Sequence, residues 1–344
     1  METDKAMSNI KNKLNYFNTI GLVAMEGRGF SNPVDIAIDS TQRIYVLSRT
    51  NPDQTEGIRI GICNMDSEYF GDFGEYGTGK GQFIWPTSIA FDLQDRLFLA
   101  DEYNNRISVF DKSGQFIYCW GEKGNSEGRL NGPSGITFDL EGNLLVVDHL
   151  NNRVQKFTDK GEFISAWGEK GSNLGQFNLP WGISVNHTGE IIVSDWRNNR
   201  IQKFSADGAI INSYPKLGEV DIFNRPSSAV MDDDGYLYVA DWGNEKVKVL
   251  NSQGKLIQEL KGEGSLSLWA EEFLDANLDQ KKFRNQSDLD PVLDPSVKTE
   301  YEASARVEKY FWGPISIKTD NKGYLYVVES NRHRLQVYSI NKDI

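Results

Sequence analysis

Apolar and polar residues alternate with period two along most of the chain, in short runs rich in Val, Ile, Phe and Tyr that Gly and Asp residues separate. Alternation of this kind predicts half-buried β-strands joined by turns. The runs come in groups of four, and the first run of each group opens at a proline. We therefore expect the unit of the fold to be a four-stranded antiparallel meander.

This unit recurs at steps of 47, 47 and 46 residues, which is the length of four short strands with their turns. Its clearest copies open at Pro86, Pro133, Pro180 and Pro226. In each copy the second run ends in an acidic residue, and in three of them a loop then leads to Asn-Asn-Arg, as from Asp148 to Arg153. Two less regular copies open at Pro33 and Pro314. The chain thus contains six repeats.

Repeats that cannot bury their own faces stack on one another, so residues 1–344 are expected to form one domain despite their length. Six meanders in a circle make an all-β, six-bladed β-propeller. The last repeat reaches Ile344 after only three strands, and residues 15–21 match the pattern of the missing outermost strand. We expect this N-terminal strand to pair into the last blade and close the ring, which removes an exposed sheet edge.

The repeated residues resemble a known family. The Pro-x-Gly-Ile opening, the strand that ends in Asp, the Asn-Asn-Arg loop and the Trp-Gly-Glu-Lys-Gly closing turn are similar to NHL repeats over most of the chain. The resemblance implies an NHL-type propeller. Such propellers include RNA-binding and protein-binding modules, extracellular sensor domains and a zinc-dependent amidating lyase, so it leaves the function open.

Charge and composition exclude several classes of function. The net charge of -12, without a basic patch, argues against binding to nucleic acid. No apolar run has the length of a signal peptide or of a membrane span, so we expect a soluble, cytoplasmic protein. Two cysteines, Cys63 and Cys119, are too few for a disulfide scaffold and are expected to be buried thiols.

Metal and cofactor chemistry is not indicated either. The amidating lyases that share this fold hold zinc with three histidines, and this chain has only three. His149 and His333 fall in loops of opposite blades, whereas His187 falls in a turn on the other face, so they do not converge on one ion. No phosphate-binding loop or dinucleotide fingerprint is present. We expect no metal and no cofactor.

Residues that recur in every blade are best explained as architecture, so function is sought where the repeats differ. The first strand of each blade begins on one face of the ring, here named the top face. The loops between the second and third strands lie on the same face. In the first blade the loop from Ser48 to Arg59 carries six extra residues, including Pro52 and Gly57. It is the smaller of two departures on this face.

The larger departure is an insertion between blades 5 and 6. Leu260 and Pro314 are 54 residues apart, against 13 from Trp120 to Pro133, so about 41 residues are added. Residues 263–309 are expected to be helical. One helix is predicted after an N-cap at Ser267, with an apolar stripe, and a second from Asp294 to about Lys309. A helical hairpin over the top face would be a lid, a docking arm or a decoration.

Aromatic residues also gather on the top face. Some are expected to pack between blades, and the others to line a concave site for an apolar, aromatic or cationic ligand or to anchor a protein. With two loop residues of blades 3 and 6, the candidate ligand-binding residues are Trp85, Tyr103, His149, Trp181, Trp196, Trp242, Trp312 and Arg332.

The central channel offers candidate catalytic residues. Two residues after each opening proline the blades carry small residues except for Asp35, and four residues after it the single basic residue is Lys318. These two charges either pair near the axis, where their ionisation would be coupled, or simply hydrate the channel mouths. Glu329 is a third candidate, because blades 2 to 5 place Asp there.

Two functions follow from these patterns. The first is a binding module that recognises a protein or a small ligand on its top face. The alternative is a propeller enzyme without zinc, a lyase, hydrolase or isomerase, whose site at the channel mouth lies under a helical lid and uses Asp35, Lys318 and Glu329. The identity of the ligand or substrate and the oligomeric state do not follow from the sequence.

Overall fold

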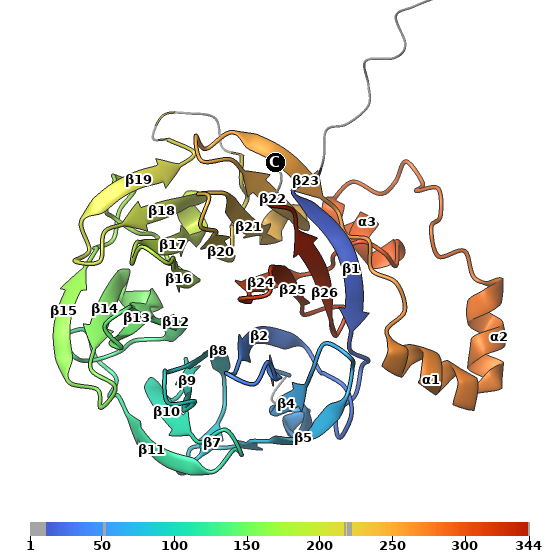
Figure 1. Cartoon of the computed structure of the whole chain (residues 1–344), viewed down its shortest axis with the longest axis horizontal. Helices are drawn as coiled ribbons and strands as arrows, with labels where there is room; N and C mark the ends of the chain where they lie inside the picture. The colour runs from blue at the N-terminus through green and yellow to red at the C-terminus, as the bar shows by residue number, and fades with distance from the viewer. Residues whose placement is uncertain (1–11, 51–52, 217, 219–221, 343–344) are drawn as a thin grey trace, which may run out of the picture.

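The chain forms a ring of six four-stranded antiparallel sheets around a central channel (Figure 1). The computed structural model describes residues 12–50, 53–216, 218 and 222–342. It confirms the six-bladed β-propeller predicted from the repeats. Blade 1 comprises β2 (Pro33–Ile38), β3 (Ile44–Ser48), β4 (Ile60–Cys63) and β5 (Tyr69–Phe73).

The next three blades repeat this order with little change. Blade 2 comprises β8 (Pro86–Phe91), β9 (Leu97–Asp101), β10 (Arg106–Phe110) and β11 (Phe116–Trp120). Blade 3 comprises β12 (Pro133–Phe138), β13 (Leu144–Asp148), β14 (Arg153–Phe157) and β15 (Phe163–Trp167). Blade 4 comprises β16 (Ile183–Val185), β17 (Ile191–Asp195), β18 (Arg200–Phe204) and β19 (Ile210–Tyr214).

The last two blades lie on either side of the insertion. Blade 5 comprises β20 (Ser228–Met231), β21 (Leu237–Asp241), β22 (Lys246–Leu250) and β23 (Leu256–Leu260). Blade 6 comprises β24 (Pro314–Thr319), β25 (Tyr324–Glu329), β26 (Arg334–Ile340) and β1 (Leu14–Ile20). Strand β1 pairs antiparallel with β26, from Leu14 opposite Ile340 to Ile20 opposite Leu335. The two ends of the described chain thus share one sheet.

Short elements connect the strands. A parallel pair, β6 (Glu75–Tyr76) and β7 (Gln82–Phe83), joins blades 1 and 2. Single 3-10 turns follow the second strands of four blades, namely η1 (Thr55–Gly57), η2 (His149–Asn151), η3 (Trp196–Asn198) and η4 (Trp242–Asn244). The extra loop of blade 1 holds η1, and its Pro52 lies outside the described residues. These turns place the tips of the loops on the top face.

The recurring acidic residues are structural. Asp148 is fully buried and accepts hydrogen bonds from the backbone N–H of Asn131 (2.6 Å), from Asn151 Nδ2 (2.8 Å) and from Arg153 Nε (2.8 Å). Equivalent acids stand at the ends of the second strands of blades 2, 4, 5 and 6. Since each ties its loop to the connection before the blade, the interpretation of these residues as architecture agrees with their contacts.

The core consists of apolar clusters between neighbouring blades rather than one central mass. Second strands are almost wholly buried, and the side chains of β13 alternate between a cluster shared with blade 2 and a cluster shared with blade 4. Phe110, Phe157 and Phe204 each end a third strand inside such a cluster. The blades therefore stabilise one another around the ring.

The insertion contains one helix more than predicted, and its last helix starts later than predicted. It contains α1 (Leu268–Ala276), α2 (Leu278–Gln286) and α3 (Glu300–Arg306). Ser267 caps α1 as predicted, because its side chain accepts from the N–H of Ala270. The second predicted helix is displaced, because Thr299 and Glu302 form a capping box that starts α3, whereas Asp294 accepts from the N–H of Ser296 in a turn.

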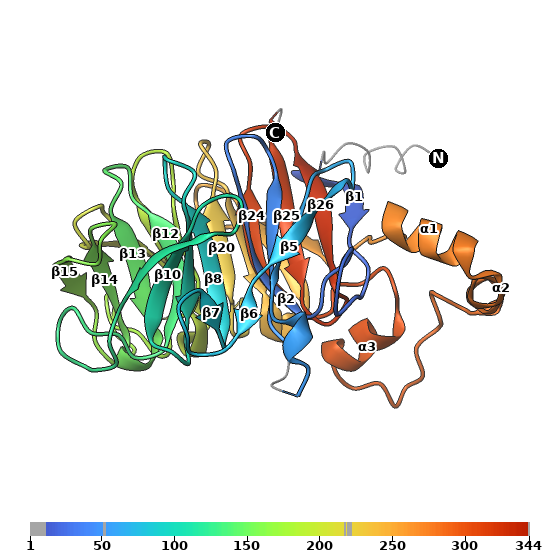
Figure 2. The ribbon, with the colours of Figure 1, turned by 90° about the horizontal axis from the view of Figure 1, so that it is seen from below.

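The helices do not cover the top face. Figures 1 and 2 show α1, α2 and α3 beside the ring, outside blades 5, 6 and 1, and not over the central channel. Trp269 of α1 is fully buried between blades 6 and 1, and its Nε1 donates to the carbonyl of Ser67 at 2.5 Å. The insert therefore does not form a lid over the channel mouth, which was one of its three considered roles, because Trp269 anchors it on the outer edge of the ring.

Candidate functional site

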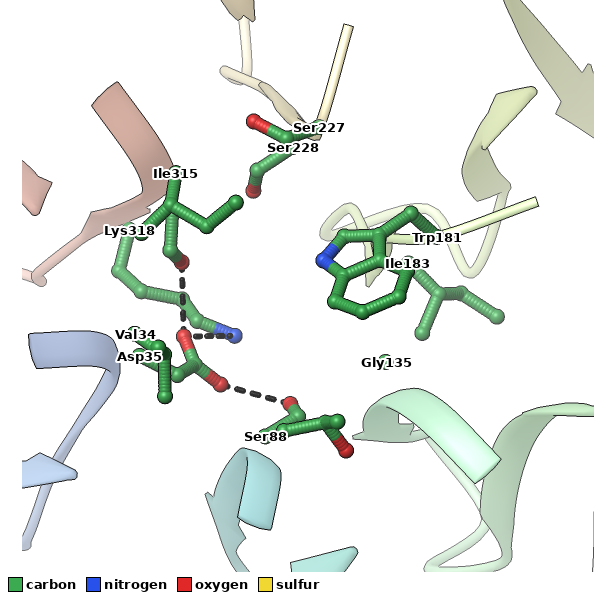
Figure 3. Close-up of a pocket in the computed structure, with 13 residues that line it drawn as sticks. Val34, Asp35, Ser88, Gly135, Trp181, Ile183, Ser227, Ser228, Ile315 and Lys318 are labelled. Atoms are coloured by element: carbon green, nitrogen blue, oxygen red, sulfur yellow. Dashed lines mark hydrogen bonds and ion pairs between the residues drawn. The ribbon is translucent and has the colours of Figure 1, made fainter. Parts of the chain in front are cut away.

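The first strands place Asp35 and Lys318 together in the central channel. Lys318 Nζ lies 3.5 Å from Asp35 Oδ1. Figure 3 shows the two side chains facing each other in the channel. Asp35 is 3% exposed and also accepts hydrogen bonds from the hydroxyls of Ser316 (2.7 Å) and Ser88 (2.6 Å) and from the N–H of Ile89 (3.0 Å). One carboxylate thus connects blades 1, 2 and 6. The two charges therefore form a pair near the axis and do not hydrate the channel mouths separately.

The channel around this pair is narrow. Small residues two positions after the opening prolines approach each other so closely that a Cβ on Gly182 would lie 2.4 Å from the carbonyl oxygen of Ser227. The open space beside Asp35 and Lys318 is about 20 Å³. A cavity of this size holds about one water molecule. The ion pair is therefore not part of a pocket that could enclose a substrate in this conformation.

Trp181 stands at the mouth of the channel, where the other blades carry smaller residues (Figure 3). Its ring lies edge-on to His149, with 5.1 Å between the ring centroids. His149 is buried, and its Nδ1 donates to the carbonyl of Pro180 at 2.9 Å. Burial lowers the pKa of His149, so the imidazole is neutral and supports Trp181 from below.

A second group of predicted residues comes together between blades 4 and 5. The indoles of Trp196 and Trp242 lie 6.1 Å apart. The guanidinium groups of Arg225 and Arg197 lie 5.2 and 5.7 Å from the centre of the Trp196 ring. We name these four residues the Trp196 cluster. Both tryptophans belong to the 3-10 turns η3 and η4, so their backbone is fixed by the fold.

Two further aromatic residues are exposed on the top face near blade 2. Trp85 is 40% exposed, and the Arg49 guanidinium lies 4.6 Å from the centre of its ring. Arg49 also pairs with Glu102 at 3.3 Å. Tyr103 is 59% exposed. Both aromatic residues lie at the surface, whereas the arginines beside Trp85 and Trp196 were missed because no arginine recurs at those positions of the repeat.

Trp312 is partly covered and Glu329 is buried. Tyr301 of α3 covers Trp312, with ring centroids 5.7 Å apart. Glu329 is 0% exposed, accepts from Arg334 Nε at 2.7 Å and from Gln336 Nε2 at 2.9 Å, and takes the place of the recurring aspartate. It does not reach the rim of the channel, where a catalytic role was considered. Arg332 faces the insert, and its Nη2 donates to the carbonyls of Ser304 and Val307.

The described residues, 12–50, 53–216, 218 and 222–342, show neither a metal cluster nor a membrane-spanning helix. That part of the chain contains no group of three or more His, Cys, Asp or Glu side chains that could hold a metal ion. Nor does it contain a helix with the length and apolar character of a membrane span. Both cysteines are free thiols, and burial raises the pKa of Cys63 to about 12.

Comparisons with known sequences point to one repeat family. The model of the NHL repeat matches residues 177–204, which contain the first three strands of blade 4. NHL repeat-containing protein 3 of Homo sapiens is 32% identical over 85 residues, which is 24% of this chain and 23% of that protein. Protein brain tumor of Drosophila melanogaster is 44% identical over 46 residues, or 13% of this chain and 4% of that protein. The similarity thus spans about a quarter or less of these relatives' own length.

Solved structures share the fold at low sequence identity. The virginiamycin B lyase of Staphylococcus aureus superposes with a TM-score of 0.56 at 13% identity, over 96% of this chain and 99% of that one. A gluconolactonase of Xanthomonas campestris gives a TM-score of 0.56 at 13% identity, over 91% and 88% of the two chains. These likenesses concern the fold alone. Together with the repeats and the ring geometry, the comparisons show a six-bladed β-propeller in which residues 177–204 match the NHL repeat.

Proposed function

We propose that this propeller is a recognition module that binds a protein partner through its top face. The observation that carries the proposal is the Trp196 cluster, which presents two indoles and two guanidinium groups on one surface. Trp and Arg are the residue types that most often dominate the energy of protein interfaces. Their backbone is held by the loops of blades 4 and 5, so little order has to be gained on binding.

The charges of the cluster indicate the chemistry of the partner. Arg197 and Arg225 project from a protein whose net charge is -12, so they form a local positive region. A partner that presents carboxylates beside apolar side chains would pair with the arginines and pack on the indoles. Trp85 and Tyr103, exposed on the same face, would extend the contact.

The proposal is tested by capture from an extract of the source cells, followed by purification of the partner. The double variant Trp196→Ala/Trp242→Ala is compared with the parent. The matched control is Leu93→Ala/Leu140→Ala, because these residues are 88% and 64% exposed in turns on the opposite face. A partner that the parent and the control retain and the cluster variant loses supports the proposal. A partner that the cluster variant retains equally well contradicts it.

Catalysis in the channel is a second candidate, and one observation favours it. Asp35 and Lys318 form an ion pair among hydroxyl groups, and propellers of similar fold include a lyase and a gluconolactonase. The narrow channel argues against it, since a substrate would have to widen it. A panel of lactone substrates tests the idea. Turnover that Asp35→Asn abolishes while the variant stays folded would favour the enzyme.

A further inference from the structure

A cleft lies between α1, α2 and the outer side of blade 6. Its volume is about 440 Å³, which is in the range of pockets for small organic ligands. We name it the insert cleft. One wall is apolar and is formed by Leu22, Val23, Leu266, Phe273 and Leu274. The polar part of the lining, here called the polar end, contains Arg284, Glu308, Arg332 and His333.

The apolar wall is open to solvent. Val23 is 58% exposed and Phe273 is 38% exposed. Trp269, on the same helix as Phe273, is fully buried against the ring. The helix therefore uses one apolar residue to hold the insert in place and leaves another to line the cleft. Covering these side chains with an apolar ligand would remove their surface from water.

The polar end carries one positive charge that no acid neutralises. Both terminal nitrogens of Arg284 donate to the Glu308 carboxylate, with 2.6 Å from Nη1 to Oε2. Although burial opposes its ionisation, contact with Arg284 keeps the pKa of Glu308 below its ordinary value, so this pair is neutral overall. Arg334 is likewise paired with Glu329. In the part of the chain that the structure describes, Arg332 forms no ion pair.

Arg332 is held by neutral groups only. Its Nη2 donates to the carbonyls of Ser304 (2.6 Å) and Val307 (3.0 Å), and its Nε has no acceptor in the described structure. Burial and then the charge of Arg334 lower the pKa of Arg332, although the nearby Glu329 and Glu308 oppose this shift, so the environment disfavours the charged form. An arginine remains protonated near neutral pH even so. A bound anion would offset this cost.

We propose that the insert cleft binds a small organic monocarboxylate, with its carboxylate on Arg332 and its apolar body along Leu22 and Phe273. One uncompensated cation matches a monoanion, and the apolar wall selects a ligand with a hydrocarbon body over a small inorganic anion. The cleft lies on the outer side of blade 6 and the Trp196 cluster between blades 4 and 5, so this site is independent of the proposed protein-binding surface.

Isothermal titration calorimetry with octanoate tests the proposal, with octan-1-ol as the uncharged probe of equal length and inorganic phosphate as the anion without an apolar body. The parent is expected to bind octanoate more tightly than octanol and not to bind phosphate. Arg332→Gln is expected to weaken octanoate about 10- to 100-fold and to leave octanol unchanged, because it removes one charge-assisted contact.

Two further variants separate recognition from loss of structure. Phe273→Ala is expected to weaken octanoate and octanol equally, because it reduces only the apolar wall. Arg129→Gln is the matched control, since Arg129 is exposed and paired with Glu122 outside the cleft, and it should change neither affinity. Equal binding of octanoate by the parent and Arg332→Gln, or binding of phosphate as tight as that of octanoate, would overturn the proposal.

Discussion

At the scale of single residues, each joint, meaning the contact between one blade and the next, depends on one residue with a left-handed backbone conformation. The residue before the third strand has a φ between 51° and 56° in blades 2 to 6, and its side chain accepts a hydrogen bond from the backbone just before the next blade. These residues are Asn105, Asn152, Asn199, Glu245 and His333, with acceptor distances from 2.6 to 2.9 Å. Asparagine tolerates this backbone and cannot titrate. The two titratable residues both adjoin blade 6.

The joint that closes the ring is expected to weaken in acid. His333 Nδ1 accepts from the N–H of Asn32 at 2.9 Å, which a protonated ring cannot do. Burial lowers the pKa of His333, so its contribution to stability is present above the unfolded value of about 6.5 and is lost as the pH falls below it. His333→Asn should keep the bond and remove this dependence.

Urea unfolding of both proteins between pH 8 and pH 5 measures the effect. The free energy of unfolding of the parent should fall relative to that of His333→Asn as the pH drops below about 6.5. Parallel pH profiles would show that the closing joint does not depend on the neutral imidazole.

Glu245, at the other joint of blade 6, is expected to have the opposite pH dependence. Burial, together with the nearby Glu329 and Glu300, raises its pKa to about 7, although the N–H of Gly313 donates to it. The folded state then binds a proton that the unfolded chain has lost, so stability should decrease as the pH rises from about 4.5 to 7. Glu245→Gln accepts the same bond without a charge. Its gain in unfolding free energy over the parent should be larger at pH 8 than at pH 5, and a constant difference would count against the shifted pKa.

Asp35 is expected to contribute to the stability of the fold, by linking blades 1, 2 and 6, more than to catalysis. Its removal leaves Lys318 and the buried N–H of Ile89 without their partner. Asp35→Ala should therefore lower the free energy of unfolding by about 3 kcal/mol, and Asp35→Asn, which retains an acceptor, by less. Denaturation in urea measures both. A loss below about 1 kcal/mol in the alanine variant would show that the three blades do not depend on this carboxylate.

The sequence indicated the position of Asp35 and Lys318 but not the geometry around Glu329. The channel residues follow from counting after each proline, since the first strands share one register. Glu329 looked exceptional because it differs from Asp in the other blades, yet its buried partners Arg334 and Gln336 make it a longer version of the same structural acid. A difference in residue type alone did not reveal whether the side chain was exposed.

At the scale of elements, the insert completes the ring. In blades 1 to 4 an aromatic residue at the end of the outer strand packs on a glycine of the next blade, and a Cβ on Gly161 would lie 2.4 Å from Trp120. Where blade 6 meets blade 1, the outer strand ends in Ile20, and Cys63 stands where blades 2 to 4 have phenylalanine. Trp269 fills the space that these smaller residues leave. The insert thus holds blades 6 and 1 together at the seam where the ring closes.

Removal of this side chain should destabilise the whole propeller. Trp269→Ala leaves a cavity and deprives the Ser67 carbonyl of its donor, so a loss of about 3 to 5 kcal/mol in unfolding free energy is expected. Leu278→Ala is the control, because this residue of α2 is 71% exposed, and it should cost little. Thermal and urea unfolding measure both variants. Equal stability of the two would mean that the insert does not hold the seam.

The place of the insert could not be predicted from its own sequence. Periodicity and the cap at Ser267 located α1, but the surface that receives Trp269 is made by Ile20, Phe30 and Cys63, which are about 200 residues or more away along the chain. The second helix was placed too early because the carboxylate of Asp294 resembles a cap, whereas the reciprocal bonds of Thr299 and Glu302 are stronger.

At the scale of the whole molecule, the repeat period determines the architecture and the departures from it determine the surfaces. Six near-identical units give a ring whose recurrent Asp, Asn and Arg residues connect loops, so chemistry that differs between blades is confined to a few places. The Trp196 cluster, the Asp35–Lys318 pair and the insert cleft are three such places. Each combines residues from at least two blades or from a blade and the insert.

The affinity of the captured partner for purified variants tests the central claim most directly. Because each hot-spot side chain contributes at least about 2 kcal/mol, Trp196→Ala/Trp242→Ala should weaken binding about 30-fold or more. Leu93→Ala/Leu140→Ala, on the opposite face, should leave the dissociation constant unchanged. A cluster variant that binds as tightly as the parent, or a control that loses binding instead, would contradict recognition through the top face.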